Sequence, residues 1–402
     1  MLYSIALIFL CGMLLGSFAE KIKLPGLLGM LIVGIILGPS VLNLMSPELM
    51  GIAPELRQIA LVIILTRAGL SLNIHDLKKV GRPALLMCFV PACFEITGMI
   101  VFAPIFLHIS ILEAAIMGAV IAAVSPAVVV PRMLRLMDEG YGTDKGIPQM
   151  IVTGSSADDV FDIVLFTTFA SLAQGGKVSA GSFVQVPASI IIGILVGVIY
   201  GFVISYFFKN VHIRDSLKVI ILLGIAFVFV SAEQSLKDIV PFSGLIAVMS
   251  SGMMINRKRR EVADRLSSKF SKLWVATEIV LFVLVGASVD IKYAMNAGIS
   301  ALIVIFGALL FRMAGVFCCM IKTRLTIKER LFCMIAYIPK ATVQAAIGGV
   351  PLAMGLPCGP IVLTVAVVAI LVTAPLGAFG TDMTYKKLLR KAQTEVEAKP
   401  AV

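Results

Sequence analysis

Three aspartates stand close together in the stretch TGSSADDVFD (residues 153–162), inside a run that is otherwise apolar. On a helix, positions three or four apart share a face, so Ser155, Asp159 and Asp162 form one polar stripe, with Asp158 beside it. Neighbouring carboxylates can bind either protons or a hard cation, whose preferred ligands are oxygen atoms. This pattern predicts competition between protons and a cation for the same acids.

The elements that position these acids are predicted to be membrane-spanning helices. The chain has 402 residues, of which 59% are hydrophobic and only 14% are charged, and its mean hydropathy is +1.03. Apolar runs of about 18 or more residues recur from end to end, each long enough to cross a hydrocarbon core of about 30 Å as a helix. We therefore expect an all-α polytopic membrane protein with about 13 transmembrane helices, over residues 2–19, 25–42, 55–72, 83–107, 109–131, 148–173, 183–208, 216–236, 240–256, 270–290, 296–321, 329–355 and 359–380.

Positive charge is distributed unevenly among the connections between these spans. Lys and Arg concentrate in alternate connections, which include RKRR (257–260), whereas the other set carries only Arg57, Lys177, Lys237 and Lys292. By the positive-inside rule, we expect the N-terminus outside and the C-terminus in the cytoplasm, in the cell inner (plasma) membrane. The net charge of +11 alone could indicate a nucleic-acid partner, but this distribution points to membrane topology, so we expect a lipid bilayer as partner and no nucleic acid.

The sequence offers no motif for a cofactor or for enzymatic catalysis. Its seven cysteines are scattered through apolar segments without paired spacing, and it contains no glycine-rich phosphate loop or cluster of metal-ligand residues. We therefore expect no cofactor and no enzymatic activity.

The spans divide into six (residues 1–173), one linker span (174–215) and six more (216–380), followed by a cytoplasmic tail (381–402). An odd linker makes the second six run opposite to the first, which is the inverted-repeat architecture of many transporters. The fifth span of each six contains proline, which removes a backbone donor and interrupts a helix. Because the interruptions match, we expect a crossed pair of broken helices rather than two independent kinks, formed around Ser125, Pro126, Pro339, Thr342 and Gln344.

Glu95, Arg312 and Lys340 also lie well within their spans, where each charge costs about 2.5–3.5 kcal/mol on insertion scales. Glu95 and Arg312 occupy the fourth span of each six, so we expect them to pair. Lys340 follows a proline and is expected to face unwound carbonyls or Asp158. Two fixed cations cannot neutralise four buried acids, so a role for the acids restricted to salt bridges is insufficient.

Several longer strings resemble those of a known family over residues 65–377: LTRAGL, AVSPAVVVP, GYGTDKGIP, LLFRMAG, IPKATVQAAIG and LTVAVVAILVTAPLG. With the adjacent aspartates, they resemble the monovalent cation:proton antiporter superfamily, in its two-aspartate branch, and the bacterial sodium/proton exchangers of the NHA type. The resemblance implies a homodimer with a rigid dimerisation domain and a moving core domain. It implies that Asp159 is the main ion- and proton-binding carboxylate, with Asp158 beside it, and that Arg312 replaces a lysine of other relatives. Asp162 departs from the family pattern, in which a small apolar residue is usual.

The function that we expect is secondary active exchange of Na⁺ (or Li⁺) for H⁺ by alternating access. Three alternatives remain open from the sequence: a cation channel with the acids as a selectivity ring, a K⁺/H⁺ exchanger, and a proton-coupled carrier for an organic anion. The anion carrier would favour more basic groups at the crossover than Arg312 and Lys340.

Overall fold

A computed structural model describes residues 1–71, 81–174, 180–211, 213–235 and 242–392. Throughout these ranges the regular structure is helical, apart from one isolated β-bridge between Tyr141 and Lys391, and this confirms the all-α class. The helices are α1 (Leu2–Lys21), α2 (Gly26–Leu37), α3 (Pro47–Gly51), α4 (Ala53–Ser71), α6 (Arg82–Met87), α7 (Val90–Leu107), α8 (Ile111–Ala122), α9 (Pro126–Glu139), α10 (Ile147–Gln174), α11 (Ala180–Asn210), α12 (Asp215–Ser235), α13 (Gly244–Lys258), α14 (Arg260–Ala287), α15 (Ile291–Cys319), α16 (Ile327–Ala336), α17 (Thr342–Ile347), α18 (Val350–Ala353) and α19 (Gly359–Leu388).

Eight helical segments in the described ranges are long and apolar enough to cross a membrane, which supports a multi-pass membrane protein. The other predicted spans correspond to short α2 and α13, to α4 and α10 with their charged residues, and to the interrupted series α16–α18. These elements fall outside the eight because each carries charged residues, is short, or is interrupted by a break in the helix. The count of 13 spans and the inverted repeats stay predictions.

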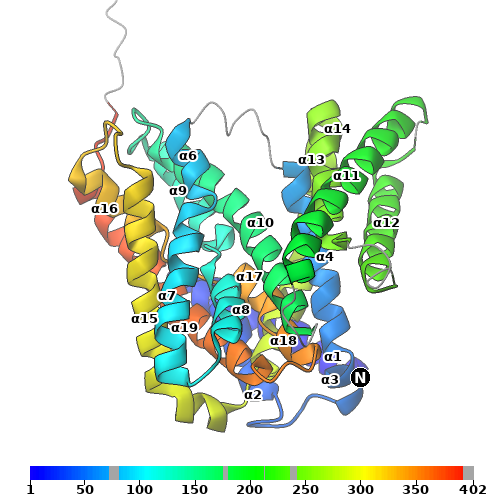
Figure 1. Ribbon diagram of the computed structural model, residues 1–402, viewed down its shortest axis with the longest axis horizontal. Coiled ribbons are helices and arrows are strands. Elements are labelled where there is room, and N and C mark those ends of the chain that lie inside the picture. The colour runs from blue at the N-terminus through cyan, green and yellow to red at the C-terminus, as the bar shows by residue number, and fades with distance from the viewer. Residues whose placement is uncertain (72–80, 175–179, 212, 236–241, 393–402) are drawn as a thin grey trace, which may run out of the picture.

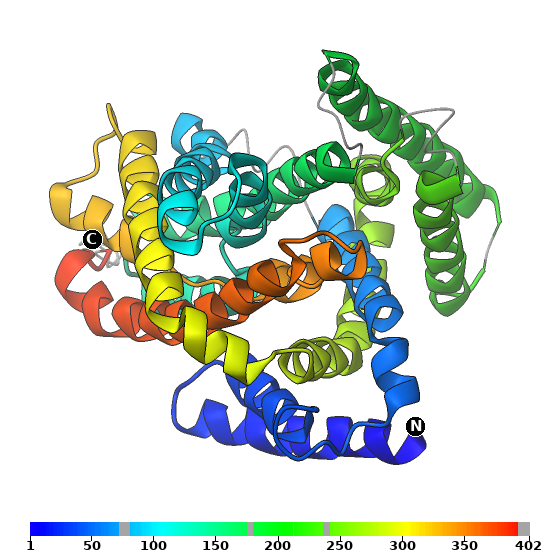
Figure 2. The same ribbon diagram turned by 60° about the horizontal axis from the view of Figure 1, so that its bottom comes forward.

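The helices pack into two groups. The first, called here the α4 bundle, contains α1, α2, α4 and α11–α14; the second, the α10 bundle, contains α6–α10 and α15–α19. Figure 1 shows α7, α9, α15 and α16 on the left and α11–α14 on the right, and Figure 2 shows α1 and α2 along one edge of the molecule. Contacts between the bundles are few and involve mainly α17 with α4 and α14, α2 with α19, and α10 with α11.

Two interrupted helices cross inside the α10 bundle. The chain is non-helical between α8 and α9 and again between α16 and α17, and the amide of Ser125 in the first break donates to the carbonyl of Pro339 in the second at 2.8 Å. Both interrupted series begin with a capping box, Ser110 with Glu113 and Thr326 with Glu329, which fixes where each helix starts. A backbone donor freed by the first break is therefore paired with a backbone acceptor freed by the second, as expected where two broken helices cross.

Candidate ion-binding site

The three aspartates of α10 are buried beside this crossing. Asp158 and Asp162 are 0% exposed and Asp159 is 9% exposed. The Oδ2 atom of Asp158 accepts hydrogen bonds from Arg312 Nη2 at 2.7 Å and from the amide of Val124 at 3.1 Å. Asp158 is thus held between α15 and the first break, with a guanidinium as its counterion.

Glu95 on α7 accepts from two cations through the same oxygen. Arg312 Nη1 lies 2.8 Å and Lys340 Nζ lies 2.5 Å from Glu95 Oε2. The contact expected between Glu95 and Arg312 is present. Lys340, which was expected to face unwound carbonyls or Asp158, pairs with Glu95 and also donates to the carbonyl of Ala122 at 2.9 Å.

These contacts form a continuous series from Lys340 through Glu95 and Arg312 to Asp158. All four side chains are at most 1% exposed. Two acids are therefore matched by two cations within hydrogen-bond distance, which is the arrangement that makes buried charges tolerable.

The other acids of the cluster have no such partner. Among the described residues, Oδ1 of Asp159 and both carboxylate oxygens of Asp162 are buried without a hydrogen-bond partner. Unpaired oxygens also occur on Ser125, Thr342 and Gln344 at the two breaks. Buried polar atoms without partners are rare and call for a ligand, a proton or water.

Neutral polar side chains of the site are oriented by the broken backbone. Gln344 Nε2 donates to the carbonyls of Ile121 and Ala123 at 3.0 and 2.8 Å, which leaves Oε1 free. Ser155 donates its hydroxyl proton to the carbonyl of Val152 at 3.0 Å, so only its lone pairs remain for another group. Both side chains consequently present oxygen acceptors, the donor type that hard cations select.

Some contributors could not be recognised from the sequence. The carbonyl of Ala122 receives both Arg312 and Lys340, and the carbonyl of Tyr337 accepts from Arg312 Nε at 3.0 Å. Thr373 on α19 accepts from the amide of Lys340 at 3.0 Å. Backbone groups carry no residue-type signal, but Thr373 lies in the string LTVAVVAILVTAPLG, which did carry the resemblance.

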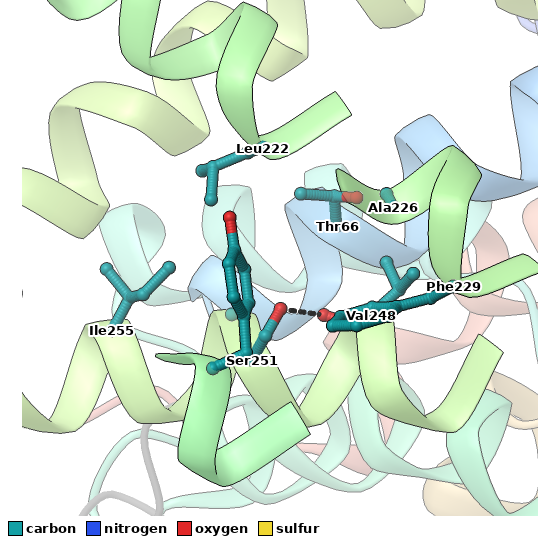
Figure 3. Close-up of a pocket in the computed structure, with 9 residues that line it drawn as sticks. Thr66, Leu222, Ala226, Phe229, Val248, Ser251 and Ile255 are labelled. Carbon is teal, nitrogen blue, oxygen red and sulfur yellow. Dashed lines mark hydrogen bonds between the residues drawn. The ribbon is translucent and has the colours of Figure 1, made fainter. Parts of the chain in front are cut away.

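A separate small cavity lies away from the acids. It has room for about one water molecule and is lined by residues of α4, α11, α12 and α13, among them Thr66, Leu222, Phe229 and Ser251. Figure 3 shows the hydroxyl of Ser251 turned to the carbonyl of Val248, a bond of 2.6 Å. The cavity is mainly apolar and contains no acid, so it does not extend the ion-binding site.

Broken helices that meet in an apolar bundle, beside buried carboxylates of which some lack a counterion, are typical of secondary transporters for cations. The chain belongs to the sodium/hydrogen exchanger family, because the family model described as "Sodium/hydrogen exchanger, transmembrane" matches residues 5–387. Membership makes the chain a transporter rather than an enzyme, and the resemblance to monovalent cation:proton antiporters is confirmed.

Individual relatives agree with this assignment. Sodium/hydrogen exchanger 9B2 from Homo sapiens is 32% identical over 415 residues, which cover 98% of this chain and 76% of the human protein. The protein of the same name from Xenopus tropicalis is 31% identical over 416 residues, again covering 98% and 76%. Among solved structures, the sodium proton antiporter MjNhaP1 from Methanocaldococcus jannaschii superimposes with a TM-score of 0.83 at 22% identity, covering 96% of this chain and 97% of that one. This likeness shows that the fold is shared.

Proposed function

We propose that the protein exchanges Na⁺ or Li⁺ for H⁺ by alternating access, and that proton and cation compete for Asp159. The observation that carries the proposal is that some of the buried acids have a cationic partner and others have none. Asp158 and Glu95 have cationic partners at 2.5–2.8 Å, whereas Asp159 and Asp162 have none among the described residues. An unpaired carboxylate in a poorly solvated site is stabilised by binding either a proton or a cation.

The stoichiometry follows from the pairing. A guanidinium does not lose its proton in proteins, so Arg312 keeps Asp158 ionised throughout the cycle. Asp159 then trades one proton for one cation, while Asp162 retains its proton. In this scheme no net charge crosses the membrane, and exchange is electroneutral.

The ion ligands in this proposal are Asp159 and Asp158, with Ser155 and the oxygens of the two breaks nearby. The cation is a transported substrate and no resident metal is invoked. The protein works as a homodimer in the plasma membrane, with the N-terminus outside and the tail in the cytoplasm. The resemblance and the charge of the connections support this arrangement.

The test is proton flux in proteoliposomes after addition of each alkali cation. Asp159→Asn should abolish the flux while the protein stays folded, because the amide keeps the shape but binds neither ion. Asp264→Asn, the same substitution at an exposed aspartate of α14, is the matched control and should leave the flux unchanged. Substantial Na⁺-driven flux from purified Asp159→Asn would overturn the assignment.

Two further readouts separate exchange from the alternatives. With the membrane potential clamped, a rate that changes strongly with potential would show that Asp162 or Asp158 also cycles. Cation currents without proton movement against a sodium gradient would indicate a channel, and flux only with K⁺ would indicate a K⁺/H⁺ exchanger. If proton and Na⁺ share Asp159, the apparent KM for Na⁺ should rise by up to about tenfold per pH unit on acidification.

A further inference from the structure

A buried arginine lies at the seam between the two bundles. Arg57 on α4 is only 6% exposed, and its Nη1 atom donates to the hydroxyl of Ser288, just after α14, at 3.1 Å. The guanidinium packs against Gly349, which joins α17 to α18: a Cβ atom added at Gly349 would lie 2.9 Å from Arg57 Nη1. A single side chain thus links α4 and the end of α14 to the part of the broken helix that follows the break.

The charge of Arg57 is not matched in the way that Arg312 is. No ion pair joins Arg57 to an acid in the part of the chain that the structure describes, although Glu55, two residues earlier, attracts it from a distance. One hydroxyl is weak compensation for a buried cation. The guanidinium therefore depends on the tight approach of Gly349 and Ser288, and it loses that environment if the seam opens.

The position of this contact matters because the bundles touch at few places. Contacts of α17 with α4 and α14 form a principal part of the junction between the bundles. Thr342 and Gln344 of α17, which carry unpaired oxygens of the ion-binding site, lie at most seven residues before Gly349. A movement that carries α17 and α18 away from α4 separates Arg57 from Gly349.

We propose that Arg57 is a positioning residue that latches the α17–α18 junction to the α4 bundle and closes the seam on the α3 side of the ion-binding site. The inference rests on the proposed exchange function, because alternating access is what makes the latch consequential. The latch stabilises the conformation in which the seam is closed, over the conformation in which it opens. A fixed positive charge in the closed seam also repels cations that would leak through it.

Loss of the latch shifts the balance between the two conformations and leaves the ion ligands intact. When the conformation open to one face of the membrane becomes more populated, the apparent affinity for a ligand added at that face increases. With the α3 side outside, the apparent KM for Na⁺ should fall at the outer face and rise at the cytoplasmic face. The loss of one charged hydrogen bond corresponds to a shift of roughly tenfold.

The experiment compares the two faces of the membrane in proteoliposomes with a single orientation of the protein. Na⁺-driven proton flux is measured for the wild type, Arg57→Gln and Arg57→Lys at fixed pH. Gly349→Ala approaches the same contact from the other bundle, since its methyl group displaces the guanidinium. Arg82→Gln is the matched control, because Arg82 is exposed on α6 and, among the described residues, its side chain donates to the carbonyl of Ile321 at 3.4 Å.

A KM that falls at the outer face and rises at the cytoplasmic face in Arg57→Gln and Gly349→Ala, with Arg57→Lys closer to the wild type and Arg82→Gln unchanged, supports the latch. The reverse pair of shifts overturns it. Unchanged values, or shifts in the same direction at both faces, overturn it. Hydrogen exchange of residues 342–353 should accelerate in Arg57→Gln even if that variant does not transport, and equal protection would also overturn the latch. Absence of exchange in the wild type would instead refute the proposed function, and the latch with it.

Discussion

The order of the buried charges, Lys340 to Glu95 to Arg312 to Asp158, predicts which substitutions compensate each other. Glu95→Gln leaves Lys340 without an acid and Arg312 with only one. Removing one member of a buried ion pair costs about 3–5 kcal/mol, and we expect Lys340→Gln to cost a similar amount. The double variant Glu95→Gln with Lys340→Gln removes a neutral pair and leaves Arg312 on Asp158, so it should lie within about 2 kcal/mol of the wild type.

These free energies correspond to measurable shifts in melting temperature. An unfolding entropy of about 2.1 cal/mol/K per residue gives roughly 0.8 kcal/mol/K for 402 residues. Each single variant should therefore lose about 4–6 °C and the double variant at most about 2 °C, whereas additive effects would remove about 7–12 °C.

The assay is thermal unfolding in detergent at a fixed heating rate, followed by size-exclusion chromatography of the folded fraction. Glu95→Gln with Arg312→Gln is the informative comparison, because it leaves Asp158 without its guanidinium donor. That variant should melt below the Glu95→Gln, Lys340→Gln variant. If the latter melted at the sum of the single effects, the pairing described for Lys340 would be refuted.

Three further predictions concern the packing around the site. Gly154→Ala should destabilise the protein by about 1–3 kcal/mol through overpacking, since a Cβ atom there would collide with the Tyr337 hydroxyl, and Tyr337→Phe in the same chain should recover part of the loss in melting temperature. Lys145→Met should lower stability by about 1–3 kcal/mol because the Glu329 side chain, 2% exposed, loses its partner at 2.8 Å; adding Glu329→Gln should lessen the loss, and no recovery would count against the pair. Leu389→Ala should cost about 2–5 kcal/mol, because Leu389 is 5% exposed and packs beside the bridge that ties the chain after α19 to the turn before α10; an unchanged melting temperature would show that this segment is not anchored.

The positions of the acids and of the two breaks could be predicted because particular residue types, aspartate and proline, mark them in the sequence. Aspartates in an apolar run and prolines in the fifth span of each six are unusual, so they indicate where the site and the breaks lie. The pairing of Glu95 with Arg312 followed from charge and from equivalent positions in the two sets of six. The sequence could not predict that Lys340 pairs with Glu95 instead of Asp158. The direction of a side chain next to a break depends on the conformation of the non-helical backbone, which the sequence pattern does not give.

Arg57 shows a second limit of sequence reasoning. Its place at the start of a span suggested a residue of an outer connection, where a positive charge is solvated. In the structure α4 begins at Ala53, and Arg57 is covered by residues almost 300 positions away in the chain. Burial of this kind depends on how the two bundles pack against each other, and the residues around Arg57 in the sequence do not indicate it.

The two breaks and the paired charges together account for exchange rather than leakage in the proposed mechanism. The carbonyls at the end of α8 are freed by the first break and bind the cations Arg312 and Lys340 and the amide of Gln344. Each of these cations also has an acid, so neither is available to neutralise Asp159. A bare Asp159 carboxylate would then be costly whenever the site is closed to water. In the mechanism that we propose, the α10 bundle changes sides at low cost only when Asp159 holds a proton or a cation, and movement of one is thereby coupled to return of the other.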